Sequence, residues 1–323
     1  MRAARRLTRG SLRILCYHGL WTIDDSPFGD RLFMPAAQFT TRMEWLAESG
    51  FPVLPLGEAV DLLAEDRVPD GATVITIDDG WASTYTHMLP VFERLRLPAT
   101  CYVTTYYAQK GGPVVNVAVN YLLNRAASGT YVLSDLLPPV TAPLILDDDD
   151  SREAAGAYIR PAIDALPYKD RIAALRAIAD RFGVGTEPWF GERQFHLMTP
   201  EEIGDASARG LDIQLHTHRH RGLHDGVDHV AEELAENRAH LRSMIGADKP
   251  LDQFCYPSGG FDAKGEAILA DCGVKSATLV DEGINAPGTN PYRLRRFLDG
   301  RSVARAHVHA YLSGTLDLIE RVR

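Results

Sequence analysis

The chain has 323 residues, 45% of them hydrophobic, so it can bury the core of one large α/β domain or of two ordinary ones. Its formal net charge of −9 argues against binding to nucleic acid, because proteins that hold phosphate backbones through charge are basic. The four cysteines form no Cys-x-x-Cys pair, which favours reduced thiols: Cys16, Cys101, Cys255 and Cys272.

The first twenty residues are rich in arginine but contain no apolar stretch of signal-peptide length. No segment approaches the ~20 apolar residues of a membrane helix. We therefore expect a cytoplasmic protein, and the sequence does not specify its oligomeric state. The arginines allow weak contact with an anionic membrane surface, but we expect a frayed, solvated terminus instead: Arg2, Arg5, Arg6, Arg9 and Arg13.

Short apolar runs alternate with amphipathic segments along most of the chain. The runs have the length and composition of buried strands: 12–18, 51–56, 72–79, 99–105, 211–215, 252–257, 274–280 and 292–298. Helical spacing of apolar residues separates them: 36–50, about 57–65, about 84–95, about 228–245, 262–271 and after 302. This alternation predicts a parallel sheet covered by helices, either open or closed into a barrel.

The alternation stops between about residues 106 and 198. Residues 114–127 and 169–182 have helical spacing, and a proline-rich stretch lies between them. We expect a mostly helical insertion within a single catalytic domain that spans residues 1–323. The acidic run from Asp147 to Asp150 is typical of a solvated loop, because four adjacent carboxylates repel one another.

Three of the expected strands end in residues that can carry chemistry. One ends in Asp78-Asp79-Gly80, one in "HTHRH" with His216, His218 and His220, and one in "YPSGG". Each has an ordinary structural explanation, since aspartate, glycine and proline suit turns. The carboxyl ends of parallel strands meet at one edge of the sheet, however, so the three motifs are expected to converge there.

Together the motifs predict a metal-assisted hydrolase of an amide or ester. Two imidazoles and one carboxylate are a ligand set of catalytic zinc, which leaves one position open for water. One of two adjacent aspartates can then bind the ion while the other takes a proton from the bound water. The turn in "PSGG" offers backbone N–H groups to a developing oxyanion.

The motifs "ILCYHG" (14–19), "TIDDG" (76–80), "HTHRH" (216–220) and "YPSG" (256–259), in this order, resemble the polysaccharide deacetylase family of carbohydrate esterases with NodB-like domains. The resemblance covers roughly 11–105 and 199–300. It implies an α/β fold of the distorted (β/α)7 barrel type and metal-dependent removal of N-acetyl groups from amino sugars.

Carried over by position, the resemblance implies that Asp78 is the general base and that Asp79, His216 and His220 bind one divalent ion. Zn²⁺ is expected, with Co²⁺, Ni²⁺ or Mn²⁺ as alternatives. The resemblance also implies that the backbone N–H of Ser258 helps to hold the oxyanion.

The sequence departs from the family pattern at two positions. Cys255 stands where many members carry an arginine that orients the catalytic aspartate, and Arg296 is a candidate replacement. No late histidine is a clear match for the family's general acid, since His307 and His309 lie in a segment with helical spacing.

Four further residues are candidates for substrate binding: His18, His218, Tyr256 and Arg296. His18 follows the first strand, where a substrate or acid role and a buried structural role both fit. His218, which is not a ligand by the resemblance, suits either the support of its loop or a substrate contact.

The expected substrate is an amino sugar of a polysaccharide, lipid-linked or nucleotide-linked glycan. The same metal site also fits a hydrolase of a small amide, formamide or cyclic imide, because the fold and the ion fix the reaction rather than the pocket. A non-catalytic glycan-binding protein is the remaining alternative.

Overall fold

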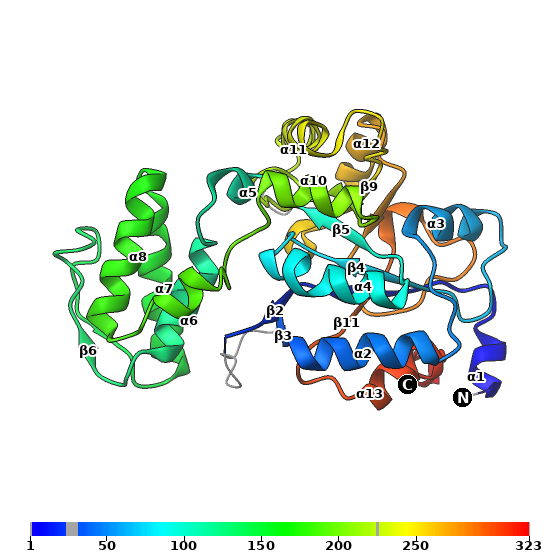
Figure 1. Cartoon of the computed structure of the whole chain (residues 1–323), viewed down its shortest axis with the longest axis horizontal. Helices are drawn as coiled ribbons and strands as arrows, with labels where there is room; N and C mark the ends of the chain where they lie inside the picture. Colours follow the sequence, from blue (N-terminus) through cyan, green and yellow to red (C-terminus); the bar gives the residue numbers. More distant parts are fainter. Residues whose placement is uncertain (1, 24–31, 224–225, 323) are drawn as a thin grey trace. The chain divides into compact units, whose positions relative to one another are not determined.

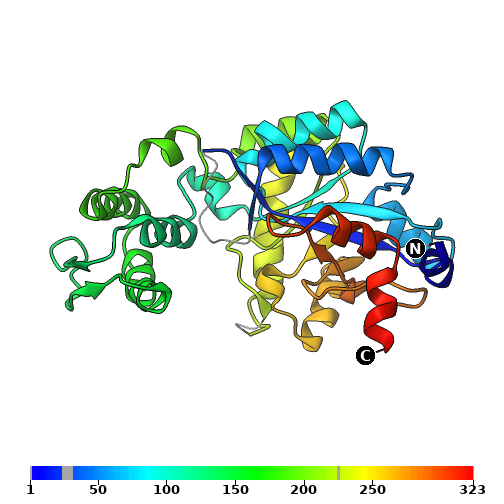
Figure 2. The same ribbon diagram turned by 90° about the horizontal axis from the view of Figure 1, so that it is seen from below.

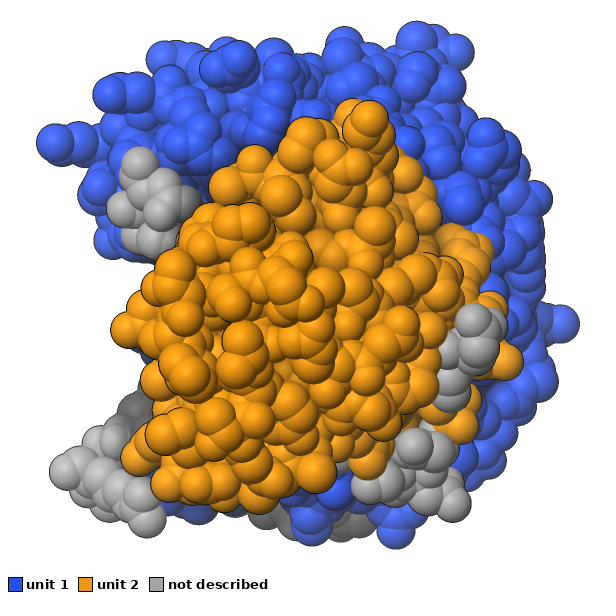
Figure 3. Space-filling view, turned by 90° about the vertical axis from the view of Figure 1, so that its left-hand side faces the viewer, with its two compact units in different colours: residues 1–20, 31–109, 198–323 blue, residues 21–30, 110–197 orange. Residues whose placement is uncertain are grey.

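A computed structural model describes residues 2–23, 32–223 and 226–322. The chain forms two compact units, coloured in Figure 3. The sheet unit comprises residues 1–20, 31–109 and 198–323, and the helical unit comprises residues 21–30 and 110–197. The expected insertion at about 106–198 overlaps the helical unit, and the single catalytic domain stays a prediction.

The sheet unit is built on seven parallel strands in the order β10-β9-β8-β5-β4-β1-β11. Their bounds are β1 (Arg13–Tyr17), β4 (Thr73–Ile77), β5 (Thr100–Val103), β8 (Asp212–Leu215), β9 (Gln253–Cys255), β10 (Ser276–Thr278) and β11 (Phe297–Leu298). Leu294 pairs in parallel with Thr278 of β10, while Phe297 pairs with Leu15 of β1. The two edges of the curled sheet are thus linked, which confirms the predicted barrel-like α/β fold.

Helices surround this sheet in Figures 1 and 2. They are α1 (Arg2–Leu7), α2 (Ala36–Glu48), α3 (Leu56–Ala64), the π-helix η1 (Thr84–Met88), α4 (Leu89–Leu95), α5 (Tyr106–Lys110), α10 (Pro200–Ala208), α11 (Val230–Ile245), α12 (Ala263–Asp271), α13 (Arg305–Leu312) and α14 (Thr315–Val322). Helix α2 shows why these segments are helical, because Phe39, Met43 and Leu46 recur at helical spacing and are buried.

Short elements complete the sheet unit. They are the strands β2 (Gly19–Trp21), whose last residue belongs to the helical unit, and β3 (Phe33–Pro35), which pair, and the 3-10 turns η3 (Pro257–Gly259) and η4 (Pro291–Arg293). The strand expected at 51–56 is reduced to a bridge between Val53 and Thr73. Pro52 and Pro55 explain this reduction, since proline has no N–H for a ladder.

The register of the strands aligns the residues that follow them. Tyr17 of β1 lies opposite Ile77 of β4, and Val103 of β5 lies opposite Leu215 of β8. The next residue along each of these strands is His18, Asp78, Thr104 or His216. The predicted convergence of the motifs at one edge of the sheet is therefore a consequence of the parallel register.

The helical unit contains α6 (Val115–Arg125), β6 (Thr130–Tyr131), β7 (Leu144–Ile145), α7 (Asp149–Asp164), α8 (Tyr168–Phe182) and α9 (Glu187–Gly191). Its core includes the buried aromatic side chains Trp21, Tyr121, Trp189 and Phe195. The helices expected near 114–127 and 169–182 are present as α6 and α8.

The acidic run is a helix start rather than the expected loop. Asp148 caps α7 through a capping box with Ser151, and Asp149 and Asp150 form its first turn. Carboxylates are stabilised there by the positive end of the helix dipole. Helix α7 was not predicted because Pro161, a residue that disfavours helix interiors, lies inside it.

The amino terminus differs from the expected frayed segment, since residues 2–7 form α1. Arg13 is fully buried and donates to the carbonyl oxygen of Leu312, so it is not available to a membrane surface. Arg5 donates to the carbonyl oxygen of Asp70. None of the helices in the described part of the chain combines the length and the apolar character that a membrane crossing requires.

Candidate metal and catalytic site

The backbone at the carboxyl edge of the sheet is strained where the motifs meet. Asp79, Thr217, His220 and Ser258 all have φ between 53° and 72°, and they are four of the seven non-glycine residues with positive φ in the described chain. Such conformations cost free energy and cluster at functional sites. The turn at Asp79, continued by Gly80 at φ 85°, brings the side chains of two adjacent aspartates to the same edge.

Asp79, His216 and His220 converge as the sequence predicted. The Nε2 atoms of both histidines lie 3.2 Å from Oδ1 of Asp79. Potential ligand atoms of the three residues all lie within 4.8 Å of one another. The Asp79 and His216 side chains are buried, whereas the His220 side chain is 35% exposed. One side of the group is therefore open to an incoming molecule.

The donor chemistry of this group fits a divalent cation. Nδ1 of His216 lies 2.9 Å from the carbonyl oxygen of Cys255, an acceptor that requires the proton on Nδ1. In a neutral His216 this hydrogen bond leaves the lone pair on Nε2, 3.2 Å from Oδ1 of Asp79, so a proton or a cation between the two atoms is needed to make the contact favourable. A tetrahedral zinc site with ordinary bond lengths separates such N and O ligands by ~3.4 Å.

The local fields keep Asp79 ionised. Burial would raise the pKa of Asp79, but hydrogen bonds from His216 and His220 hold it well below its ordinary value. Burial would lower the pKa of His216, and the hydrogen bond to Asp79 raises it instead. Both shifts report the same excess of negative charge at the group, which a bound cation would neutralise.

Asp78 lies beside this group but has different partners. Arg296 donates to its two carboxylate oxygens at 2.7 and 2.8 Å, and both side chains are at most 4% exposed. Burial would raise the pKa of Asp78, but the charge and hydrogen bonds of Arg296 hold it below its ordinary value. Arg296 thus contacts Asp78 in the way expected of a replacement for the missing arginine at position 255.

Oδ2 of Asp78 is surrounded by three further groups. The thiols of Cys16 and Cys255 lie 3.7 and 3.5 Å from it, and Nε2 of His18 lies 3.7 Å from it. Cys255 also lies 3.2 Å from Nη2 of Arg296, so the smaller side chain at this position leaves room for the arginine. All four cysteines are free thiols, as expected.

The other predicted residues occupy varied positions. His218 is buried, with Nδ1 2.8 Å from Oγ1 of Thr105, and its carbonyl oxygen accepts from the N–H of Tyr106, which supports a role within its loop. Tyr256 is fully buried and donates to the carbonyl oxygen of Tyr292, so it offers no surface to a substrate. Arg296 is likewise too buried for the substrate contact that was its other predicted role.

Ser258 lies in η3 directly after β9, and its role at an oxyanion stays a prediction. Thr217, between the two ligand histidines in sequence, is 1% exposed, and its hydroxyl has no hydrogen-bond partner among the described residues. His307 and His309 lie in α13, the helix that their spacing predicted.

Two residues of the site were missed in the sequence. Trp81 donates its indole N–H to Oδ2 of Asp79 at 2.9 Å, which leaves Oδ1 directed at the histidines. Asn237 of α11 accepts from the backbone N–H of His216 and donates to the carbonyl oxygen of Val103. Its position on the apolar stripe of α11, between Leu234 and Leu241, was the available signal.

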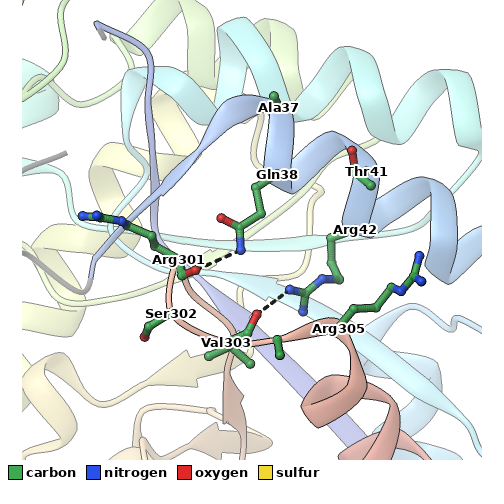
Figure 4. Close-up of a pocket in the computed structure, with 9 residues that line it drawn as sticks. Ala37, Gln38, Thr41, Arg42, Arg301, Ser302, Val303 and Arg305 are labelled. Carbon is green, nitrogen blue, oxygen red and sulfur yellow. Dashed lines mark hydrogen bonds between the residues drawn. The ribbon is translucent and has the colours of Figure 1, made fainter. Parts of the chain in front are cut away.

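An open groove of about 710 Å³ lies elsewhere in the sheet unit, between α2 and residues 301–305 (Figure 4). Gln38 and Arg42 of α2 cross it to donate to the carbonyl oxygens of Arg301 and Val303. Arg42 is also paired with the buried Asp299 at 2.7 Å. The groove contains neither Asp78 nor Asp79, and its polar side chains anchor the segment after β11 to α2.

Comparisons with known proteins agree with this site. A family model described as polysaccharide deacetylase matches residues 65–134 and 159–277, more than half of the chain. A Bacillus subtilis protein named "Putative polysaccharide deacetylase YxkH" is 31% identical over 93 residues. That match covers 28% of this chain and 31% of the relative's length.

Solved structures share the fold at low sequence identity. A Streptococcus pyogenes deacetylase, PplD in complex with acetate, has a TM-score of 0.59 at 14% identity, with 94% of this chain and 98% of that chain covered. IcaB from Ammonifex degensii has a TM-score of 0.57 at 19% identity, with 94% and 97% covered. The stretch that matches the family model contains Asp78, Asp79, His216 and His220. We conclude that the chain belongs to the polysaccharide deacetylase family.

Proposed function

We propose that the protein is a metal-dependent hydrolase that removes N-acetyl groups from amino sugars of a glycan. The observation that carries this proposal is the convergence of Asp79, His216 and His220 beside a second, separately held carboxylate, Asp78. This arrangement supplies an ion site and a base within one edge of the sheet. Membership of the family and the deacetylase named among the structural relatives support the same reaction.

Each residue of the site has a distinct part in this reaction. Asp79, His216 and His220 would hold the ion, expected to be Zn²⁺, which polarises the amide carbonyl and lowers the pKa of a bound water. Asp78, kept ionised by Arg296, accepts the proton of the attacking water. The backbone N–H of Ser258 donates to the oxygen that becomes negatively charged.

The departing amine needs a proton, and we assign its delivery to His18. Its Nε2 lies 3.7 Å from Oδ2 of Asp78, and its side chain is 13% exposed, so it borders both the base and the open edge. Nδ1 of His18 is buried without a hydrogen-bond partner among the described residues. With no partner at Nδ1 and the Asp78 carboxylate near Nε2, a neutral His18 carries its proton on Nε2, from which it can be transferred.

The function is tested by incubating the metal-replete protein with N-acetylated amino-sugar oligomers, small amides, a formamide and a cyclic imide. We expect acetate release from the amino-sugar substrates and none from Asp78→Asn protein of equal metal content. Hydrolysis confined to a small amide would change the substrate class. No acid release from any substrate would contradict the enzyme and favour a glycan-binding protein.

The role of His18 is tested by changing the leaving group. An amine leaves only after protonation, whereas the phenolate of an aryl acetate leaves without it. His18→Gln should lower N-deacetylation by about 10² and leave aryl acetate hydrolysis nearly unchanged. Asp78→Asn serves as the control that lowers both reactions. Equal loss of both reactions in His18→Gln would contradict the assignment.

A further inference from the structure

A second set of metal-ligating side chains lies next to the Asp79 group. It consists of Cys16, His18 and Asp78, whose potential ligand atoms all lie within 4.8 Å of one another. Cys16 and His18 are two residues apart along β1 and its extension, so their side chains lie on the same face. Thiolate, imidazole and carboxylate are the three ligand types that zinc takes in proteins.

The distances in this set suit a single ion. The thiol of Cys16 and Nε2 of His18 each lie 3.7 Å from Oδ2 of Asp78. A tetrahedral zinc ion with ordinary bond lengths requires S···O and N···O separations of ~3.6 and ~3.4 Å. Both distances to Oδ2 are therefore within a few tenths of an ångström of those in a zinc site, and the partial exposure of His18 gives the ion an entry side.

The salt bridge to Arg296 does not use all the lone pairs of the Asp78 carboxylate. Arg296 donates one hydrogen bond to each carboxylate oxygen, and a carboxylate has about four lone-pair sites. On Oδ2 the second lone-pair site has only thiols as hydrogen-bond donors among the described residues, including that of Cys255 at 3.5 Å, and a thiol is a weak donor that an ion can displace. A divalent cation that displaces one thiol proton adds a single positive charge to this region, and the charges of Asp78 and the Cys16 thiolate lie between it and the guanidinium of Arg296.

We propose that Cys16, His18 and Asp78 form a second, inhibitory site for a thiophilic divalent cation such as Zn²⁺. On binding, the Cys16 S–H bond breaks, an S–metal bond forms and one proton goes to solvent, with no change in oxidation state. The ion then binds to Asp78 and His18, the base and the acid of the proposed hydrolase, so that neither can transfer a proton. The inhibition rests on the proposed function, whereas the binding of the ion does not.

Titration of the metal-free protein with Co²⁺ tests the binding directly. The Asp79 group contains no sulfur, so thiolate-to-cobalt charge-transfer absorption reports an ion bound through Cys16 or, in the neighbouring set Asp78, His216 and Cys255, through Cys255. We expect two bound equivalents, the second accompanied by this absorption and by release of one proton. Cys16→Ser should keep one equivalent and lose the absorption. Cys255→Ser, which alters the other thiol near Asp78, should keep both.

Inhibition is then measured with Zn²⁺ added beyond one equivalent. The concentration that halves acetate release should rise by about 10-fold or more in Cys16→Ser, since a lost ligand costs at least as much affinity as a lost supporting contact. His18→Gln provides a second binding variant should Cys16→Ser not fold.

Three results would overturn the proposal: a single bound equivalent in the wild type, a second equivalent without charge-transfer absorption, or loss of the absorption only in Cys255→Ser. Two equivalents with the absorption but no acetate release would instead leave the second site in place and contradict the proposed hydrolase.

Discussion

The two halves of the site differ in how they are built. The ion half, Asp79 with His216 and His220, lies entirely within the stretch that matches the family and includes a partly exposed ligand. The base half is almost fully buried, and three partners of Asp78 lie outside that stretch: Cys16, His18 and Arg296. A metal triad requires particular ligands in a fixed geometry. A carboxylate needs only a well-placed cation, which a different strand can supply.

The largest effect should come from breaking the ion half. His216→Ala or His220→Ala removes one of three ligands, so we expect purified protein to lose its bound ion and its hydrolytic activity. Elemental analysis after dialysis measures the loss. His218→Ala, which alters the histidine between them, should keep the ion. Equal metal content in all three variants would rule out the triad.

Breaking the base half should separate binding from turnover. Asp78→Asn keeps the size of the side chain but cannot accept the proton, so we expect full metal content and a loss of about 10² or more in kcat. Steady-state kinetics and elemental analysis on the same sample provide both values. Unchanged kcat would show that Asp78 is not the base.

The indole of Trp81 tests whether the ion half depends on its supporting contacts. Trp81→Phe keeps most of the aromatic packing and removes the donor to Oδ2 of Asp79. We expect metal affinity to fall by about 10- to 100-fold, as measured by competition with a chelating dye. An affinity equal to that of the wild type would mean that packing alone orients Asp79.

The smallest effect at neutral pH should come from Arg296→Gln, whose signature is in the pH profile. Without the guanidinium, burial raises the pKa of Asp78 toward neutral pH. Only ionised Asp78 accepts a proton, so the acidic limb of kcat/KM should move to higher pH. Arg295→Gln, at an exposed neighbouring position, is the matched control. The double variant Cys255→Arg/Arg296→Gln should move the limb back, and identical profiles throughout would show that Arg296 does not act through Asp78.

The motifs predicted the ion half more completely than its surroundings. "TIDDG" and "HTHRH" each follow a strand, and the parallel register was enough to predict their convergence. Trp81 could not be assigned from sequence because its role depends on the direction of its side chain, and for Asn237 the apolar stripe of α11 indicated burial but not its partners. Arg296 was a candidate only because position 255 lacked an arginine. The parallel sheet followed from alternating elements and its barrel form from the family resemblance, whereas α7 was missed because of Pro161.

The segment that links the two edges of the sheet, residues 294–297, also contains a residue of the site. Leu294 pairs with β10 and Phe297 pairs with β1, and Arg296 lies between these two paired residues. The pairings that close the barrel thus also hold in place Arg296, the cation that contacts Asp78. A mild denaturant concentration that opens these short pairings should lower proton transfer by Asp78 before the ion is released. Turnover should therefore be lost at a lower denaturant concentration than bound metal.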